Sequence, residues 1–283
     1  MSEDRMQASR FELKYVIPED VALAARSFVA SYLELDEFGA TLPNLSYPVH
    51  SLYLDSDDLT LYTRTINGDK NRYKLRLRFY ENRPDAPVFF EIKRRMNNTI
   101  AKQRGGVRRE FVNDLLAGRI PAPNHLISKD PRHLMALQNF CQLMANMGAG
   151  PKAHIFYMRE AWISRYDNSV RVTMDRQILC DPEPTARLST ELVNPVNVFG
   201  NQVILELKFT NRFPDWFKQL VRVFGLTQCG AAKYVDGVTL IGQHAIKRAF
   251  AFDDKLELVK VSTSKVNNMT TKTAPMIGAE AIK

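Results

Sequence analysis

The sequence predicts an α+β protein built on an antiparallel β-barrel, with a charged face lining the interior and helices packed outside. Charged pairs recur inside apolar, strand-like segments: Glu12-Leu13-Lys14, Glu91-Ile92-Lys93 and Glu206-Leu207-Lys208. Residues 74–79 alternate cation and apolar residue without a break, and residues 171–175 repeat the pattern. Residues two apart share one face of a strand, so each segment has one charged and one apolar face.

The first part of the chain is typical of strands separated by one helix. Residues 10–16 form the first strand, which stops before Pro18, a residue suited to the first turn of a helix. Apolar residues at helical spacing extend that helix to about residue 35. Residues 47–54 form the next strand, and residues 59–63 a short helix or strand. Turns at Asn67-Gly68-Asp69 and Arg83-Pro84-Asp85 precede strands 73–80 and 88–94.

The second part repeats the theme after a run rich in Lys and Arg, residues 100–110, which contains Gly105-Gly106. We expect a helix over residues 131–147, then strands 152–164 and 169–179 joined by a hairpin turn at Tyr166-Asp167-Asn168. A long loop with Pro182, Pro184 and Pro195 leads to strand 203–210. Helices 214–224 and 231–248 follow, the second interrupted at Gly237 and Gly242. Residues 1–261 form one domain, and residues 262–283, without an apolar period, a disordered tail.

Composition and charge narrow the class of protein. The 283 residues carry a formal charge of +8 with a pI near 9.4, which favours an anionic partner without identifying it. The three cysteines are scattered, with neither metal-ligand spacing nor a disulfide framework, which indicates a reducing compartment. The first ten residues are polar, and no run approaches the roughly 18 apolar residues of a membrane span. We therefore expect a cytoplasmic protein without a transmembrane segment.

The charged strand faces are expected to point inward. An ordinary antiparallel sheet buries its apolar face and leaves its charges in water. Here the charges recur on five segments, and Arg and Lys concentrated on one face would repel one another. A barrel with charges inside and helices over its apolar exterior satisfies both faces. Its interior must stay wet or hold anions, because an unpaired buried charge costs several kcal/mol. Carboxylates among the cations indicate a site for a polyanion and a divalent metal ion.

Several stretches, in this order and in strand context, resemble the VTC domain of the CYTH-like triphosphate tunnel metalloenzymes. The resemblance covers about residues 10–248. It is carried by the three Glu-x-Lys segments already named and by four further stretches: Lys74/Arg76/Arg78, Tyr157-Met158-Arg159, Ser51-Leu52-Tyr53-Leu54-Asp55 and Ala232-Lys233-Tyr234. Arg10 stands where the broader CYTH pattern has an earlier glutamate. This difference favours a VTC-type site over an adenylate cyclase or a thiamine triphosphatase.

The resemblance implies an eight-stranded antiparallel tunnel with basic walls that binds ATP, triphosphate or polyphosphate. It also implies Mn²⁺ or Mg²⁺ held by glutamates. VTC catalytic domains of eukaryotes transfer the γ-phosphate of ATP to a growing polyphosphate chain, whereas other tunnel enzymes hydrolyse triphosphate or cyclise nucleotides. The SPX and membrane domains that accompany the eukaryotic polymerases are not found in this sequence, so their regulation, translocation and membrane partners are not carried over.

The resemblance and the strand parity assign roles to the cations. Arg76 and Arg78 are the strongest candidates, because guanidinium groups engage phosphate oxygens bidentately. The expected catalytic cations are Arg76, Arg78, Lys93, Arg159 and Lys14. The expected substrate-binding residues are Lys74, Lys102, Tyr157, Lys208 and Lys233. Arg104 and Arg108 lie in the same basic run as Lys102, with solvent exposure an equal alternative.

Glu206 is the first candidate for a metal ligand, since hard divalent ions prefer carboxylate oxygens and accept substrate phosphates as further ligands. Glu12 and Glu91 come second, because each could instead form salt bridges with neighbouring cations, and Asp175 is weaker for the same reason. The five histidines are dispersed and are expected to be structural. The sequence has no P-loop.

Three functions remain open at this point. The first is polyphosphate synthesis from ATP, in which a phosphate chain accepts the phosphoryl group. The second is an inorganic triphosphatase, in which water is the acceptor. The third is a non-catalytic polyphosphate-binding module, which would need the cations but has little use for Glu206. Nucleic acid ranks well below these, because the aromatic residues mostly occupy apolar strand faces and do not form an exposed groove.

Overall fold

The computed structural model describes residues 11–97, 99–165, 169–210 and 212–247. Within them, one antiparallel sheet runs through eight strands in the order β1-β10-β8-β7-β3-β4-β5-β6, while β2 pairs with β7 and β9 with β8. The strands are β1 (Phe11–Ile17), β2 (Glu34–Leu35), β3 (Ser46–Asp55), β4 (Asn71–Phe79), β5 (Val88–Met96), β6 (Thr99–Val107), β7 (Gly150–Ile163), β8 (Val170–Pro182), β9 (Val196–Asn197) and β10 (Val203–Phe209).

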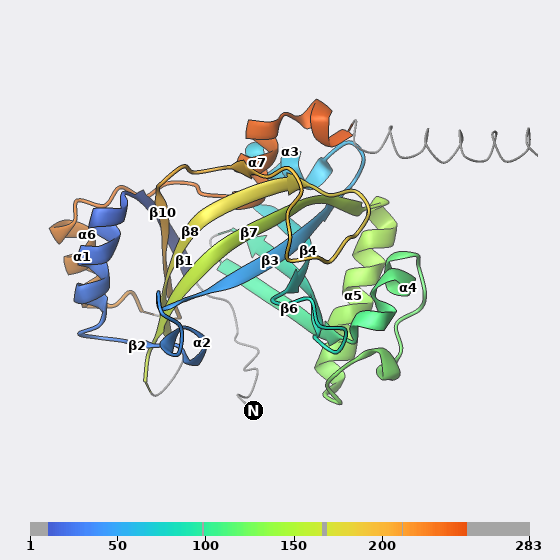
Figure 1. The fold of residues 1–283 in the computed structure, drawn as a ribbon, viewed down its shortest axis with the longest axis horizontal. Helices are drawn as coiled ribbons and strands as arrows, with labels where there is room; N and C mark the ends of the chain where they lie inside the picture. Colours follow the sequence, from blue (N-terminus) through green and yellow to red (C-terminus); the bar gives the residue numbers. More distant parts are fainter. Residues whose placement is uncertain (1–10, 98, 166–168, 211, 248–283) are drawn as a thin grey trace, which may run out of the picture.

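Helices surround this sheet (Figure 1). Two of them, α1 and α6, lie on one side, α4 and α5 lie on the other, and α3 and α7 sit together at one end. The helices are α1 (Glu19–Val29), α2 (Glu37–Ala40), α3 (Thr60–Ile66), α4 (Val112–Leu116), α5 (Pro131–Met147), α6 (Asp215–Val223) and α7 (Lys233–Ile241), with 3-10 turns η1 (Arg109–Phe111) and η2 (Pro123–His125). This arrangement confirms the mixed α and β composition and the large antiparallel sheet.

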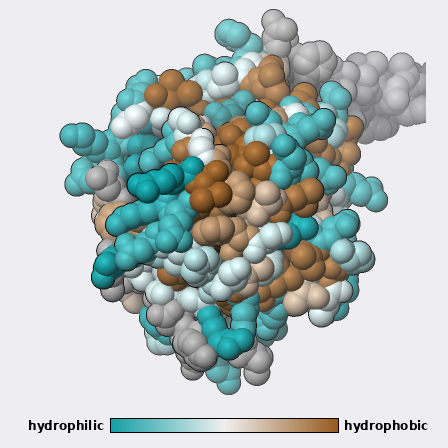
Figure 2. All heavy atoms as spheres, turned by 90° about the vertical axis from the view of Figure 1, so that its left-hand side faces the viewer, coloured by the Kyte–Doolittle hydropathy of each residue, from teal (hydrophilic) through white to brown (hydrophobic). Residues whose placement is uncertain are grey.

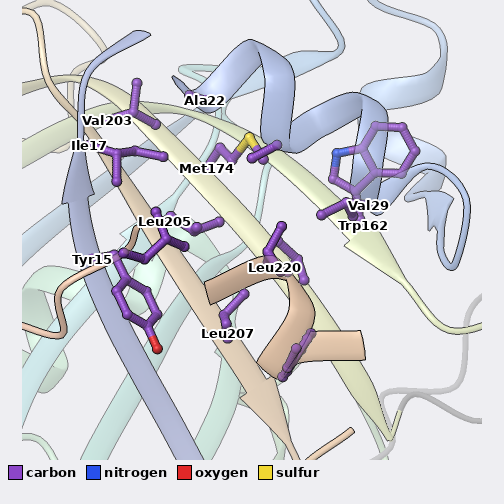
Figure 3. Packing of buried hydrophobic residues seen from close by; sticks show 14 of the residues in the cluster. Tyr15, Ile17, Ala22, Val29, Trp162, Met174, Val203, Leu205, Leu207 and Leu220 are labelled. Carbon is purple, nitrogen blue, oxygen red and sulfur yellow. The ribbon is translucent and has the colours of Figure 1, made fainter. Parts of the chain in front are cut away.

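The apolar strand faces pack against the helices, as the alternation predicted. Leu205 and Leu207 of β10 and Met174 of β8 form one cluster with Val29 of α1 and Leu220 of α6 (Figure 3). A second cluster joins the outer sides of β3, β4 and β5 to α4 and α5, and a third joins β3, β7 and β8 to α3 and α7. Removing this apolar surface from water stabilises the fold and leaves the opposite, charged strand faces turned away from the helices α1, α5 and α6.

The side of the molecule formed by α1 and α6 also keeps apolar surface in solvent. Leu23, Tyr32 and Val223 are exposed there, and the Tyr32 ring stacks on Trp216 with 4.7 Å between ring centroids. Figure 2 turns this side toward the viewer and shows hydrophobic residues gathered in its middle, bordered by hydrophilic ones.

The sheet is curled so that its two edge strands meet at a seam, but no ladder closes it into the expected barrel within the described residues. Residues of β1 and β6 come within 8 Å, Cα to Cα, while β1 pairs with β10 and β6 with β5. The free edge of β1 is used otherwise: Tyr15 forms a bridge with Gln228, and the Cys229 N–H donates to the Lys14 carbonyl at 2.9 Å. Backbone groups that this segment already satisfies are not available to β6.

The basic run at residues 100–110 contains a strand, β6, that the sequence did not reveal. Its outward face shows no regular apolar alternation, because Gly105 stands where an apolar side chain would continue the period of two. A Cβ at Gly105 would lie 2.9 Å from the carbonyl oxygen of His133 in α5. The glycine therefore lets the helix approach the strand backbone closely, which hides the strand from a pattern based on side chains.

One helix boundary and one predicted helix interruption also differ from expectation. The first helix ends at Val29 and not near residue 35, because the chain turns there, buries Leu33 and begins β2 at Glu34. The predicted interruption at Gly242 is confirmed: α7 ends at Ile241, Gly242 has φ of +93°, and helical residues resume at 243–247. Gly237 does not interrupt α7; it lies within the helix, where a Cβ would meet Cys180 Sγ at 2.6 Å. The turn predicted at residues 166–168 and the tail predicted at 262–283 lie outside the described residues.

Candidate functional site

The face of the sheet turned away from the outer helices gathers the charges that the alternation predicted. Cross-strand pairing sets Lys14 opposite Glu206, Arg159 opposite Asp175, and Arg76 opposite Glu91. We call this the inner face. Its cations are Lys14, Lys74, Arg76, Arg78, Lys93, Lys102, Arg104, Arg159, Lys208 and, from the start of α7, Lys233. Its carboxylates are Glu12, Glu91, Asp175 and Glu206.

Glu206 is surrounded by ammonium groups. Its carboxylate lies 2.5 Å from Lys208 Nζ, 3.3 Å from Lys14 Nζ and 3.4 Å from Lys233 Nζ. The Thr173 hydroxyl donates to the same carboxylate at 3.3 Å. Burial alone would raise the pKa of Glu206, but Lys208 and Lys233 hold it well below its usual value. Glu206 is therefore a buried, ionised group.

Asp175 joins β8, β7 and α7. It accepts two hydrogen bonds of 2.7 Å from the Arg159 guanidinium and lies 2.7 Å from Lys233 Nζ. Both cations also lie over the Tyr157 ring, with Arg159 Cζ at 5.0 Å and Lys233 Nζ at 4.9 Å from its centroid. Ion pairing together with ring contacts orients Arg159 and Lys233 on the inner face.

A third group lies on β4, β5 and β6 around Glu91, which is fully buried. Arg76 donates to it from Nε at 2.8 Å, and Arg76 Nη2 lies 2.6 Å from the same oxygen. Lys102 Nζ is 3.4 Å away and Arg104 Nε 3.7 Å. The pKa of Glu91 lies well below its usual value because these cations outweigh the effect of burial. Glu91 on β5 thus holds three cations from the two neighbouring strands, β4 and β6, in place.

Glu12 on β1 connects the two sides of the seam through ion pairs. Lys93 Nζ on β5 donates to both Glu12 oxygens, at 2.9 and 3.0 Å, and Lys14 Nζ lies 3.3 Å from Glu12. Glu12 and Glu206 therefore share Lys14, which lies 3.3 Å from each carboxylate. The edge strand β1 is linked to β5 by a charge pair where no backbone ladder joins β1 to β6 in the described part of the chain.

Arg78 differs from the other inner-face cations, because hydroxyl groups are its nearest partners. Its Nη2 donates to the Tyr157 hydroxyl at 3.0 Å and to Ser51 Oγ at 3.4 Å, while its nearest carboxylate, Glu91, is 3.9 Å away. Only 7% of Arg78 is exposed. A buried guanidinium with a weakly engaged carboxylate has spare capacity for an anion.

The excess of positive charge on this face shifts nearby pKa values. Burial, together with the charges of Lys14 and Lys93, lowers the pKa of Lys74 to about 8. Burial also opposes ionisation of Tyr53, but Arg76 and Lys74 prevail and lower its pKa to about 7. The Tyr53 hydroxyl accepts a hydrogen bond of 3.1 Å from Arg76. Both shifts have the direction expected of a site whose negative partner is a ligand.

The structure brings all thirteen predicted site residues into this face and adds others that the sequence did not single out. Ser51 and Tyr53 contact Arg78 and Arg76. Both lie on β3 at positions two apart, within the stretch that carried part of the resemblance, so their shared strand face was the available signal. Thr173, noted earlier only as part of a pattern, contacts Glu206 and Lys208.

One end of the inner face is covered by α7. Gly237 of this helix packs on Cys180 and Ile155, and the Tyr234 hydroxyl donates to Asp55 at the end of β3 at 2.9 Å. Asp55 also accepts the backbone N–H groups of Leu61 and Tyr62 in α3, at 2.8 and 2.9 Å. Asp55 therefore anchors both helices at this end, while Lys233 at the first position of α7 reaches the carboxylates inside.

The carboxylates can be tested as metal ligands by their donor chemistry. The described residues bring no three His, Cys, Asp or Glu side chains together as a complete cage. Mg²⁺ and Mn²⁺ sites commonly use only one or two carboxylates when substrate phosphates complete the shell. Glu12 and Glu206, joined through Lys14, offer two such carboxylates, so they fit a hard divalent ion that shares its ligands with a phosphate chain.

Comparisons with known proteins give a family match and a curated relative. The family model described as the VTC domain matches residues 9–241. Vacuolar transporter chaperone complex subunit 2 of Schizosaccharomyces pombe is 25% identical over 131 residues, which are 44% of this chain and 18% of that protein. The chain thus spans less than a fifth of this curated relative. In the part of the chain that the structure describes, no helix is both long and apolar enough to cross a bilayer.

Solved structures give more distant likenesses. A Bacillus halodurans protein named as a "putative adenylate cyclase" is 12% identical, with a TM-score of 0.45, over 79% of this chain and 93% of that one. A chain of the Schizosaccharomyces pombe Mediator head module is 9% identical, with a TM-score of 0.43, over 78% of this chain and 98% of that one.

Proposed function

This chain belongs to the VTC domain family, and we propose that its inner face binds a triphosphate and transfers a phosphoryl group from ATP to a growing polyphosphate chain. The resemblance suggests this reaction, and the geometry of the inner face supports it. Cytoplasmic location is part of the same proposal, since ATP is the donor.

One observation carries the proposal: among the described residues, the inner face as defined above gathers ten cations and four carboxylates, most of them largely buried. Each carboxylate already contacts two or more cations, so the carboxylates cannot neutralise the rest. Burying an uncompensated charge costs several kcal/mol, and a bound polyanion removes that cost. A phosphate chain has the negative charges, spaced along its length, that the three groups around Glu206, Asp175 and Glu91 lack.

The cations would act by positioning and by neutralising charge, which is most of what phosphoryl transfer requires. Arg76 and Arg78 stand on adjacent inner positions of β4 and present guanidinium groups that suit bidentate contact with phosphate oxygens. Arg159 and Lys233, held by Asp175, would contact the neighbouring phosphate from the opposite wall. Glu91 would serve chiefly to orient Arg76, Lys102 and Arg104, and its role as a metal ligand stays a prediction.

Glu206 and Glu12 would hold the divalent ion, Mn²⁺ or Mg²⁺. When bound, such an ion neutralises charge on the phosphate oxygens. Lys14 contacts both carboxylates in this structure, so it would move toward the phosphate chain when the carboxylates take the ion. Lys208, 2.5 Å from Glu206, would do the same. These four side chains would thus exchange partners when the substrate binds.

Water as acceptor gives the second candidate, an inorganic triphosphatase, because the same cations serve both reactions. A polyphosphate-binding module without catalysis is the third. The buried Glu206 favours an enzyme over a binder, since a carboxylate on an anion-binding face repels the ligand unless it has a separate task such as holding a metal ion.

Incubation with ATP and Mn²⁺ tests the proposal, with long-chain polyphosphate and free phosphate resolved on gels and quantified. Long chains that depend on Mn²⁺ and disappear in the Arg76→Ala variant would support the polymerase. Free phosphate alone, released from triphosphate, would identify a triphosphatase. Arg212→Ala is a matched control, because the Arg212 side chain is 85% exposed and lies away from the inner face.

A further inference from the structure

A row of four aromatic side chains lies at the end of the inner face that α7 does not cover. The ring centroids of Phe38 and Tyr47 are 5.8 Å apart, those of Tyr47 and Tyr80 6.5 Å, and those of Tyr80 and Phe89 6.2 Å. These residues come from α2, from the start of β3, from just beyond β4 and from the start of β5. We call them the aromatic row.

The strand register places this row directly beside the phosphate-binding cations. Tyr47 pairs with Arg159, and Phe89 pairs with Arg78. Tyr80 lies two residues beyond Arg78, on the same side of the chain. Tyr47 and Asp55 are near opposite ends of β3, and Asp55 anchors α7, so the row lies at the other end of the inner face. Tyr47 and Phe89 thus lie directly opposite Arg159 and Arg78 on neighbouring strands, and the Tyr80 backbone lies one strand step of two residues, about 6.6 Å, beyond Arg78.

The rings of the row remain accessible. Phe38 is 61% exposed, and Tyr47, Tyr80 and Phe89 are half-buried. The polar edges are anchored: the Tyr47 hydroxyl donates to Asp36 at 3.1 Å, and Arg171 donates to the same carboxylate at 3.0 Å. These contacts fix the Tyr47 ring through its hydroxyl, and the side chain stays partly exposed.

Arginine and aromatic ring already stack at this end. The Arg104 guanidinium lies 3.5 Å from the centroid of the Phe89 ring, on the strand next to it. A ligand with a flat, polarisable ring attached to a chain of phosphates would match both parts of this arrangement. Its ring would stack on the aromatic side chains while its phosphates reach Arg78 and Arg159. Nucleobases are rings of this kind, and aromatic stacking accepts any of them because every base has a π-face.

We infer that the aromatic row is a stacking subsite for the base of a nucleoside triphosphate, which makes the donor a nucleotide and not inorganic triphosphate. This rests on the proposed function, because the phosphates must lie on the inner face for the base to reach the row. It also predicts weak discrimination among the bases, since the base would be held by stacking on the rings of Tyr80 and Phe38, which any base can do.

The test compares two ligands on one protein. Dissociation constants of ATP and of inorganic triphosphate are measured by calorimetry at the same salt and Mn²⁺ concentration. Tyr80→Leu is expected to weaken ATP binding about tenfold and to change triphosphate binding less than twofold. Arg78→Met is expected to weaken both ligands to a similar degree. The same Tyr80→Leu variant should reduce the quenching of a 2-aminopurine nucleoside triphosphate on binding.

Two controls keep the outcomes distinct. Tyr32→Leu removes an aromatic ring on the far α1–α6 side and should leave both ligands unaffected. Phe38→Ala alters an exposed residue that the fold does not need, so it decides the matter if Tyr80→Leu fails to fold; a loss of about threefold for ATP alone is expected. Equal effects on both ligands, or none on ATP, would overturn the subsite. Failure of the parent protein to bind either ligand would overturn the proposed function instead.

Discussion

Replacing Arg78 with Met should separate ligand binding from stability. Methionine keeps most of the length and apolar volume of arginine but removes the guanidinium. Within the described residues, Arg78 Nη1 donates to no acceptor, and the other nitrogens contact the hydroxyls of Ser51 and Tyr157. A phosphate oxygen is the missing partner in the proposed complex, so the substitution removes a charge-assisted hydrogen bond that only the ligand-bound state makes.

The expected magnitude follows from these contacts. One charge-assisted hydrogen bond contributes about 1.5–3 kcal/mol, which corresponds to a loss of roughly tenfold to 150-fold in triphosphate affinity. The free energy of unfolding should change by less than about 1 kcal/mol, because the lost hydroxyl contacts are offset by removing a buried cation beside Arg76. Glu91→Gln should do the reverse: it leaves Arg76 and its neighbours without their carboxylate and destabilises the fold by about 3–5 kcal/mol.

Calorimetry with inorganic triphosphate at matched salt gives the affinity, and denaturant unfolding gives the stability. Arg212→Met serves as the control, because it removes the same charge from a side chain that is 85% exposed. Parent-like affinity in Arg78→Met would refute the assignment of this guanidinium to the ligand. A loss of affinity that only accompanies a loss of folded protein would refute it as well.

Three further predictions concern the metal, the pH and the packing. Glu206→Gln should abolish Mn²⁺-dependent turnover while leaving metal-free triphosphate binding equal or tighter, since it removes a negative charge; undiminished turnover would exclude Glu206 as a ligand. Lys74 and Tyr53, with pKa values of about 8 and about 7, lie below their unfolded values, so the unfolded chain holds more protons and stability without ligand should rise from pH 7 to 10. A bound anion favours their protonated forms, so binding at pH 8 should take up protons, seen as a heat that varies with buffer ionisation enthalpy; a buffer-independent heat would contradict this. Gly105→Ala should lower the melting temperature, because its Cβ would lie 2.9 Å from the His133 carbonyl oxygen, whereas a Cβ at Gly230 would meet no neighbour within 4 Å, so Gly230→Ala should leave it nearly unchanged. Equal melting temperatures of the Gly105→Ala variant and the parent would refute the close approach of α5.

The charged inner face could be predicted from the sequence because its signal is local. Glu12 and Lys14, or Lys74, Arg76 and Arg78, reveal their common face through a spacing of two along one strand. The position of β6 could not be predicted in the same way, since Gly105 replaces the apolar side chain that would have marked its outer face. A period in side chains fails where close packing of backbone takes the place of side-chain burial.

The local sequence pattern also could not predict which site residues contact one another. Ser51 and Tyr53 become site residues only because β3 pairs with β4 in a register that sets them opposite Arg78 and Arg76. Similarly, Lys233 reaches Asp175 because α7 folds back over one end of the sheet. Sequence spacing fixes which residues share a face, but long-range register decides which faces meet.

The seam between β1 and β6 has a mechanical consequence. In a barrel closed by hydrogen bonds, strand number and stagger determine the diameter. Here the Lys93–Glu12 pair spans the seam, so the distance between the two edges of the curled sheet depends there on a contact between two flexible side chains. The sheet can open along this seam by breaking the ion pair, while the backbone hydrogen bonds between its strands stay intact. In the proposed function, a long phosphate chain would then be able to enter sideways through the seam as well as at the end of the inner face that α7 does not cover.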